Sequence, residues 1–197
     1  MTERKDATKA TRAANDRLLE ELPFEDRRDF EEAERGFIAP LPDGGVIRGE
    51  DGSDVWNTSK FSFIEEDSPA PDTVNPSLWR QSQLVLKGGL FKVTDRLYQV
   101  RNADLSNLTI VEGDTGLIVF DPLITTEAAH WALEPYFAHR PRKPVVAVIH
   151  SHSHVDHFGG VKGVVSEDDV AAGKVKIVAP AGFLEAAVAE NVLAAMR

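Results

Sequence analysis

The chain has 197 residues, a length that allows one domain with or without an arm and excludes a large multidomain enzyme. Its 42% hydrophobic and 27% charged residues exclude wholesale disorder, and the absence of cysteine excludes disulfides, thiolate nucleophiles and cysteine-ligated zinc. The net charge of −10 comes without a basic stripe, so nucleic acids and anionic membrane surfaces are poor partners. Small molecules or proteins are better ones.

The acidity lies in the N-terminal third, whose pattern indicates an arm. Residues 1–72 hold 10 Lys and Arg against 19 Asp and Glu, a net charge of −9. Charged helices are expected at Thr8–Leu22 and Phe24–Arg35, followed by an extended wrapping loop over 39–76 whose aromatic side chains need a surface to pack on. The polar first residues contain no apolar run for a signal peptide or anchor, so we expect a cytoplasmic protein without a membrane span.

From residue 73 onward the pattern predicts an α/β layered fold. Four short apolar runs separated by turn signals predict an antiparallel meander, and the later segments alternate between helix and strand. The last two strands are apolar throughout, which is typical of strands buried on both faces. The expected strands are 90–93, 97–100, 108–111, 117–120, 144–150 and 174–179, and the expected helices are 76–86, 126–139 with a kink or restart at Pro135, 161–165, 166–172 and 182–196.

Four of the six histidines lie within eight residues, directly after the apolar strand at 144–150. Histidines spaced by two at a strand end point to the same side, and a turn beyond them can bring Asp156 and His157 round to the same point. Clustered imidazoles repel one another once protonated, whereas a borderline metal such as zinc binds them. The string from His150 to Gly160 therefore predicts a metal site made of histidine and carboxylate.

The assignment of ligands within this string has one alternative. His150 is in phase with His152 and His154, so these three could form a shifted trio. That arrangement leaves the neighbouring Asp156 and His157 without a role. The set without His150 is therefore the preferred prediction.

Other polar residues near the string have two possible roles. Asp121 ends the strand 117–120 and is either a turn residue or a carboxylate that orients a ligand imidazole. His130 and His139 lie on the helix that precedes the apolar strand. We expect these two to be ordinary surface histidines.

These residues resemble the signature of the metallo-β-lactamase superfamily, whose fold is an αβ/βα sandwich with one or two metals at the edge of its sheets. The chain is most similar to the linear alkylsulfatases of that superfamily, which hydrolyse alkyl sulfate esters such as dodecyl sulfate. The resemblance covers nearly the whole chain from about Leu18. It rests on the segments Asp72–Trp79, Leu97–Arg101, Ile110–Asp114, Tyr136–Pro141 and Ser151–Gly160.

The resemblance implies a role for each site residue. It implies that His152 and His154 bind one metal and that Asp156 and His157 bind the other, with Asp156 among the catalytic residues and Asp121 as the orienting carboxylate. The implied cofactor is a pair of zinc ions sharing a water whose pKa falls toward about 7. The implied substrate is an alkyl sulfate ester, attacked at sulfur or at carbon. A homodimer of the family type is also implied, although its dimerisation region is absent from this chain.

Members of this family are much longer, and their remaining metal ligands lie downstream. We therefore expect residues 1–72 to be a helical and extended arm and 73–197 to be the N-terminal half of an incomplete sandwich domain, truncated and poorly stable alone. A catalytic zinc site uses about three protein ligands per ion, and only four are offered here in total. The carboxylates beyond Gly160 are expected on solvated helix faces: Glu167, Asp168, Asp169, Glu185 and Glu190.

Three functional hypotheses follow. The first is the N-terminal part of a zinc-dependent sulfuric ester hydrolase of the alkylsulfatase type. The second is a catalytically inactive fragment or an interaction module that binds at most one metal weakly. The third keeps the superfamily but changes the substrate to a lactone, thioester or β-lactam, and the segment Asn75–Trp79 argues against it.

Overall fold

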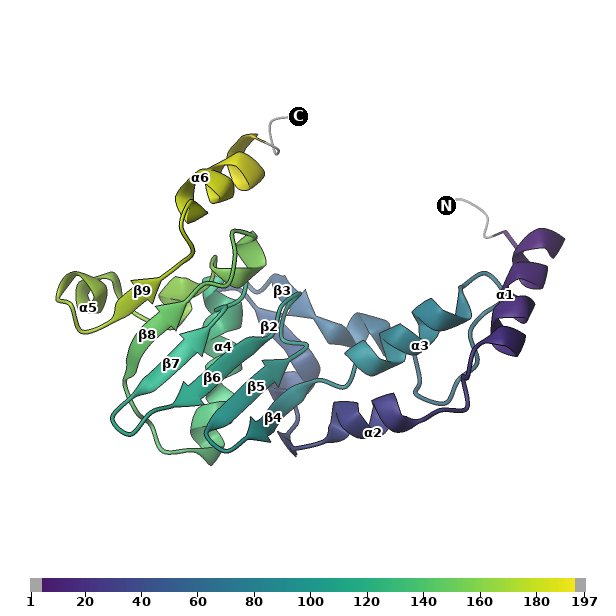
Figure 1. Ribbon diagram of the computed structural model, residues 1–197, viewed down its shortest axis with the longest axis horizontal. Coiled ribbons are helices and arrows are strands. Elements are labelled where there is room, and N and C mark those ends of the chain that lie inside the picture. The colour runs from purple at the N-terminus through teal and green to yellow at the C-terminus, as the bar shows by residue number, and fades with distance from the viewer. Residues whose placement is uncertain (1–4, 194–197) are drawn as a thin grey trace. The chain divides into compact units, whose positions relative to one another are not determined.

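The computed structural model describes residues 5–193, and their contacts group into two compact units (Figure 1). The arm unit holds the described residues up to Glu34 together with Lys60–Lys87, and the sheet unit holds Arg35–Ser59 and the described residues from Gly88 onward. A single cut after residue 72 does not reproduce this grouping, because the chain leaves the arm unit and returns to it. None of the helices between residues 5 and 193 is long and apolar enough to span a bilayer.

The arm unit contains three helices whose ends follow from local side chains. Thr8 accepts a hydrogen bond from the backbone N–H of Thr11, and Asn75 accepts two at the start of the third helix, so both act as N-caps. Pro76 follows Asn75 at the first helical position, where its missing N–H costs no hydrogen bond. The helices are α1 (Lys9–Glu21), α2 (Arg28–Glu34) and α3 (Pro76–Val85).

The sheet unit is built on a seven-stranded sheet in the order β1-β4-β5-β6-β7-β8-β9. Neighbouring strands pair antiparallel along β1-β4-β5-β6-β7, which confirms the predicted meander. β8 pairs parallel with β7 and with β9. The strands are β1 (Phe37–Ala39), β4 (Gly89–Thr94), β5 (Leu97–Arg101), β6 (Leu108–Glu112), β7 (Leu117–Phe120), β8 (Val145–Ile149) and β9 (Lys176–Val178).

The predicted wrapping loop over 39–76 is wrong for part of its length. β1 joins the edge of the large sheet beside β4, and β2 (Val46–Arg48) and β3 (Asp54–Asn57) form a separate two-stranded sheet. Each of these strands has only three or four residues and is flanked by Pro, Gly or Asp, so turn signals mask it in the sequence.

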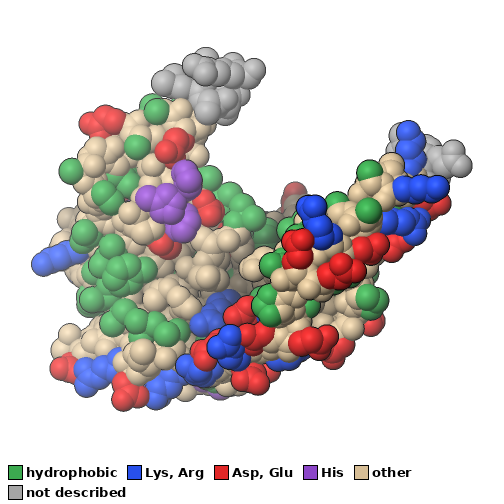
Figure 2. Space-filling model, turned by 45° about the vertical axis from the view of Figure 1, so that its right-hand side comes forward, with side chains coloured by type: hydrophobic (Ala, Val, Ile, Leu, Met, Phe, Trp, Pro, Cys, Tyr) green, Lys and Arg blue, Asp and Glu red, His purple; other side chains and the backbone are tan. Residues whose placement is uncertain are grey.

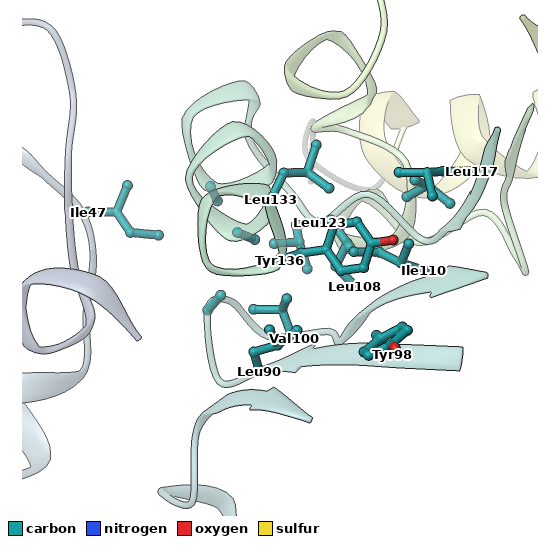
Figure 3. Close-up of a cluster of buried hydrophobic side chains, with 14 residues drawn as sticks. Ile47, Leu90, Tyr98, Val100, Leu108, Ile110, Leu117, Leu123, Leu133 and Tyr136 are labelled. Atoms are coloured by element: carbon teal, nitrogen blue, oxygen red, sulfur yellow. The ribbon is translucent and has the colours of Figure 1, made fainter. Parts of the chain in front are cut away.

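One face of the large sheet packs on α4 (Thr126–His139) to form the hydrophobic core (Figure 3). Along β5, β6 and β7 every second residue is buried, as the period of a strand requires when one face is covered. Thr125 caps α4, and the helix passes through Pro135 without interruption, so the predicted restart does not occur. The fully buried side chains around α4 include Val100, Leu108, Ile110, Leu117, Val119, Ala132 and Tyr136.

The C-terminal part of the chain is helical and stranded as predicted but less buried. β8 is buried only at Val148, and all three residues of β9 are exposed, so these are not strands covered on both faces. The predicted helix at 182–196 begins at Phe183 and continues as a π-helix, and its last residues lie outside the described part. The remaining helices are α5 (Glu167–Ala171), α6 (Phe183–Val188), the π-helix Ala189–Leu193 and the 3-10 helices Pro42–Gly45, Thr58–Phe61, Val155–His157 and Val161–Gly163.

Candidate metal centre

The polar residues of the site follow the ends of two adjacent parallel strands. Asp121 comes directly after β7, and the string from His150 to His157 comes directly after β8. Parallel strands bring their carboxyl ends to the same edge of a sheet, and the backbone N–H of Asp121 donates to the carbonyl of Ile149 at 3.0 Å. The backbone of Asp121 has φ +52°, a left-handed conformation that aspartate tolerates better than most residues. The sheet therefore brings Asp121 to the histidine string.

Asp121 accepts three hydrogen bonds that connect β7 to this string. Ser151 donates its backbone N–H to Oδ1 at 2.8 Å and its hydroxyl to Oδ2 at 2.7 Å, and Nδ1 of His157 lies 2.9 Å from Oδ2. Burial of Asp121 favours the neutral carboxyl, but the hydrogen bonds from His157 and Ser151 outweigh it and lower its pKa below the usual range. An ionised carboxylate only accepts, so Nδ1 of His157 donates this hydrogen bond, and in the neutral ring the lone pair is then on Nε2.

The Ser151 hydroxyl fixes a second imidazole in the same way. Its single proton is used on Asp121, and its oxygen lies 2.9 Å from Nδ1 of His152. The oxygen therefore accepts from Nδ1 of His152, and in the neutral ring the lone pair is then on Nε2. This role of Ser151 is not predicted by the sequence alone.

Four nitrogen and oxygen donors come together in two pairs. Nε2 of His152 lies 3.0 Å from Nδ1 of His154, and Nε2 of His157 lies 3.3 Å from Oδ2 of Asp156. The 3-10 helix Val155–His157 makes the turn that brings Asp156 and His157 back, and the His152 and His157 rings are 4.0 Å apart. Histidine side chains gather on the surface of the sheet unit (Figure 2). The structure thus brings together all four predicted ligands.

The spacing of each pair suits one metal ion. Two ligand atoms about 2.0 Å from a tetrahedral zinc ion lie about 3.3 Å apart, close to both observed distances. No three histidine, aspartate or glutamate side chains of residues 5–193 converge on one point, however, so each ion would have two protein ligands from the described chain. The donors fit the chemistry of a metal such as zinc but complete neither coordination shell.

His150 belongs to the packing beneath the site. Its ring is buried and stacks on Phe183 at 5.6 Å, and Nδ1 lies 3.1 Å from the carbonyl oxygen of His157. Burial lowers the pKa of His150, which favours the neutral ring. Within the described chain its ring neighbours are Phe158 and Phe183, so the geometry gives the alternative trio with His152 and His154 no support. His130 and His139 are exposed on α4.

The two glycines that end the string allow the loop after β7 to lie against it. A Cβ at Gly160 would lie 2.2 Å from the carbonyl oxygen of Pro122 and 2.4 Å from that of Thr125. A Cβ at Gly159 would lie 2.2 Å from the carbonyl oxygen of Ile124. These are backbone contacts that cannot move aside cheaply, so the pair of glycines sets how closely the string approaches the loop that carries Asp121.

Three further side chains support the site or lie beside it. Ser106 donates its hydroxyl to the backbone carbonyl of Asp156. The buried carboxylate of Asp104 accepts from the backbone N–H groups of Leu105 and Ile124, and burial raises its pKa. Glu190 is exposed on its helix, as predicted, and it also accepts from Ser153 at 3.1 Å and lies 3.9 Å from Nε2 of His154. Contacts between residues so far apart in sequence leave no local signal.

Residues 101–193 match the family model of the metallo-beta-lactamase superfamily. The chain is 65% identical to a linear primary-alkylsulfatase from a Pseudomonas species over 96% of its own length, and 55% identical to an alkyl/aryl-sulfatase from Saccharomyces cerevisiae over the same share. It covers only 28% and 29% of those two proteins. The superfamily implies a metal cofactor, in agreement with the donor set.

A solved structure has the same fold over the part that the two chains share. It is that of a stereoselective inverting sec-alkylsulfatase from a Pseudomonas species, 54% identical, with a TM-score of 0.91. The match covers 98% of this chain and 30% of that one. The predicted α/β fold, a partial sandwich domain of this superfamily, is therefore confirmed, as is the resemblance to alkylsulfatases.

Proposed function

We propose, on the premise that this chain is a portion of an alkylsulfatase of the metallo-beta-lactamase superfamily, that it supplies two ligands to each of two metal ions in an enzyme that hydrolyses alkyl sulfate esters. In this proposal His152 and His154 bind one zinc ion, and Asp156 and His157 bind a second. The chain spans about 30% of the length of its relatives, so the complete reaction needs residues that it does not contain.

The observation that carries the proposal is the hydrogen-bonded chain that starts at Asp121. Its carboxylate fixes His157 directly and His152 through the Ser151 hydroxyl, so both rings present Nε2 lone pairs. Orienting partners of this kind are typical of metal-bound imidazoles and have no purpose for freely rotating surface histidines. The exposure of the His154 side chain, 63%, leaves room for an ion and further ligands.

The reaction that fits this arrangement is hydrolysis by an activated water. When bound, zinc lowers the pKa of a coordinated water to about 7 and so supplies hydroxide near neutral pH. The residues of this chain hold the donors in position: Asp121 keeps the proton on Nδ1 of His157, and Ser151 keeps the proton on Nδ1 of His152. Asp156 offers a carboxylate oxygen on the same turn, beside Nε2 of His157.

One observation favours a second candidate, an isolated chain without activity. Only two donors per ion are present between residues 5 and 193, below the about three that catalytic zinc sites use. The isolated chain is therefore expected to hold less than one tightly bound zinc ion and to leave dodecyl sulfate unhydrolysed.

A chimera tests the proposed function, and the isolated chain, assayed beside it, tests the second candidate. The matched segment of the Pseudomonas linear primary-alkylsulfatase is replaced by this chain, and zinc content and dodecyl sulfate hydrolysis are measured. We expect a zinc-loaded, active chimera that His154→Ala inactivates and His130→Ala, at an exposed histidine of α4, leaves unchanged. A folded, zinc-loaded chimera without turnover would contradict the proposed function.

A further inference from the structure

The two faces of the large sheet differ sharply in exposure. On the face toward α4, Leu117, Val119 and Val148 are completely buried. Ile118 pairs with Ala147 on the opposite face, and next to them Phe120, Ile149 and Val178 form a row across β7, β8 and β9. We call these five residues the open face. Phe120 and Ile149 are half-buried and Val178 is 47% exposed, although all five are apolar.

The helix that follows β9 has a second unpaired apolar surface. Phe183 and Ala187 point inward, with the Phe183 ring 5.6 Å from that of His150. Leu184, Val188 and Val192 recur every four residues and are 71%, 45% and 51% exposed. We call these three residues the outer stripe. An i, i+4, i+8 stripe is the pattern by which a helix packs on a partner, and no described residue covers this one.

We infer that the open face and the outer stripe form one docking surface for the portion of the alkylsulfatase fold that this chain lacks, and that they bind this portion even when it is a separate polypeptide. The inference rests on the proposed function. It adds that the covalent connection is dispensable for assembly.

The comparisons identify this occupant. The described fold superposes on a solved alkylsulfatase with a TM-score of 0.91 over 98% of this chain, yet this chain covers only 30% of that protein. The rest of such a protein needs a complementary surface. Lys176, which pairs with Ala147, is the charged residue of β9 on this face, beside the apolar Val178. Hydrophobic side chains lie exposed on the same side of the sheet unit as the histidines (Figure 2). A surface in which apolar side chains predominate suits a permanent, apolar partner better than a transient polar one.

The ligand count points to the same partner. The two donor pairs complete neither metal site, and the outer stripe belongs to the helical segment that carries Glu190, 3.9 Å from His154. A partner seated on the outer stripe therefore lies beside the metal centre, where the missing ligands are needed. Docking should accordingly form a complex of larger mass and also raise the affinity of the site for zinc.

The experiment mixes the purified chain with the unmatched portion of the Pseudomonas linear primary-alkylsulfatase, expressed as a separate polypeptide. Sedimentation velocity and isothermal titration calorimetry measure association, and a chelator competition measures zinc affinity. We expect a one-to-one complex that binds zinc at least tenfold more tightly than the chain alone. Leu184→Asp and Val188→Asp should each weaken association at least tenfold.

Leu78→Asp is the matched control, because Leu78 is also an exposed leucine on a helix, 61% exposed on α3 in the arm unit. It should leave association unchanged. Two variants on the outer stripe are used so that the test remains possible if one of them fails to fold. Circular dichroism of each free variant shows whether it is folded.

Three outcomes would overturn the inference. The two pieces could fail to associate although the continuous chimera is active, or they could associate as tightly with Leu184→Asp and Val188→Asp as with the unchanged chain. The third outcome is a homodimer of this chain that uses the same surface. An inactive chimera whose two pieces still associate would instead count against the proposed function and leave the docking surface intact.

Discussion

Replacement of Asp121 by asparagine tests the chain of hydrogen bonds that orients the two histidines. The variant keeps an oxygen for the backbone N–H of Ser151, but its NH2 group cannot accept from the Ser151 hydroxyl or from Nδ1 of His157. Asparagine also tolerates the φ of +52° at this position, so little backbone strain is added. The change therefore removes two hydrogen bonds selectively.

The expected loss follows from what those bonds do. Loss of an orienting partner of a metal-bound imidazole typically weakens metal binding 10- to 100-fold, which corresponds to about 1.4 to 2.7 kcal/mol. Because Asp121 fixes His157 directly and His152 through Ser151, we expect an effect near the upper end of this range. The loss should appear in zinc affinity and only weakly in the free energy of unfolding of the metal-free chain.

Zinc affinity is measured by competition with a chromophoric chelator, and unfolding by urea denaturation. Asp43→Asn is the matched control, because Asp43 also has a positive φ, 49°, and is exposed in the sheet unit away from the histidine string. Equal zinc affinity of Asp121→Asn and the unchanged chain would refute the reasoning. So would an equal loss in Asp43→Asn.

Three further predictions concern Ser151, Glu112 and Gly160. Ser151→Ala should weaken zinc binding about tenfold while Ser151→Thr, which keeps the hydroxyl, restores it; equal affinities of the two variants would contradict the role of the hydroxyl. The buried Glu112 accepts two hydrogen bonds from Arg140 and one from Tyr136, and the Arg140 guanidinium lowers its pKa to about 2. The resulting stabilisation is complete above about pH 4.5, is lost as the pH falls toward 2, and amounts to about 2 kcal/mol after allowance for solvent around the half-exposed Arg140. Urea unfolding at several pH values should show this loss of stability. If a Glu112→Gln chain lost the same stability as the pH falls, the loss could not come from Glu112. Gly160→Ala should lower the unfolding free energy by about 2 kcal/mol or more, because its methyl group meets two backbone carbonyls, and a thermal melt unchanged from that of the parent chain would show that the loop yields.

Elements with a strong local pattern could be predicted from the sequence. The strands β5, β6 and β7 alternate between buried and half-buried residues, α4 has an N-cap at Thr125, and the histidine string follows a strand of apolar residues. Each of these signals lies within a few residues. For the same reason the sequence predicts that His152, His154, Asp156 and His157 come together, as the structure shows.

What could not be predicted depends on distant contacts. β1 forms an edge of the sheet only because β4 lies beside it, and the burial of β9 depends on a covering layer that residues 5–193 do not provide. Ser151 stands out only when β7 and β8 are aligned so that Asp121 comes within hydrogen-bonding distance. A hydroxyl next to a histidine has no such meaning in the sequence alone.

The most direct test of the central claim, that the histidine string is a metal site, is equilibrium dialysis of the purified chain against zinc. We predict weak binding, with less than one tightly held equivalent, that the double variant His154→Ala/His157→Ala, which removes one donor from each pair, abolishes and that His130→Ala leaves intact. Binding that survives the double variant, or two tightly held zinc ions in the isolated chain, would contradict the claim.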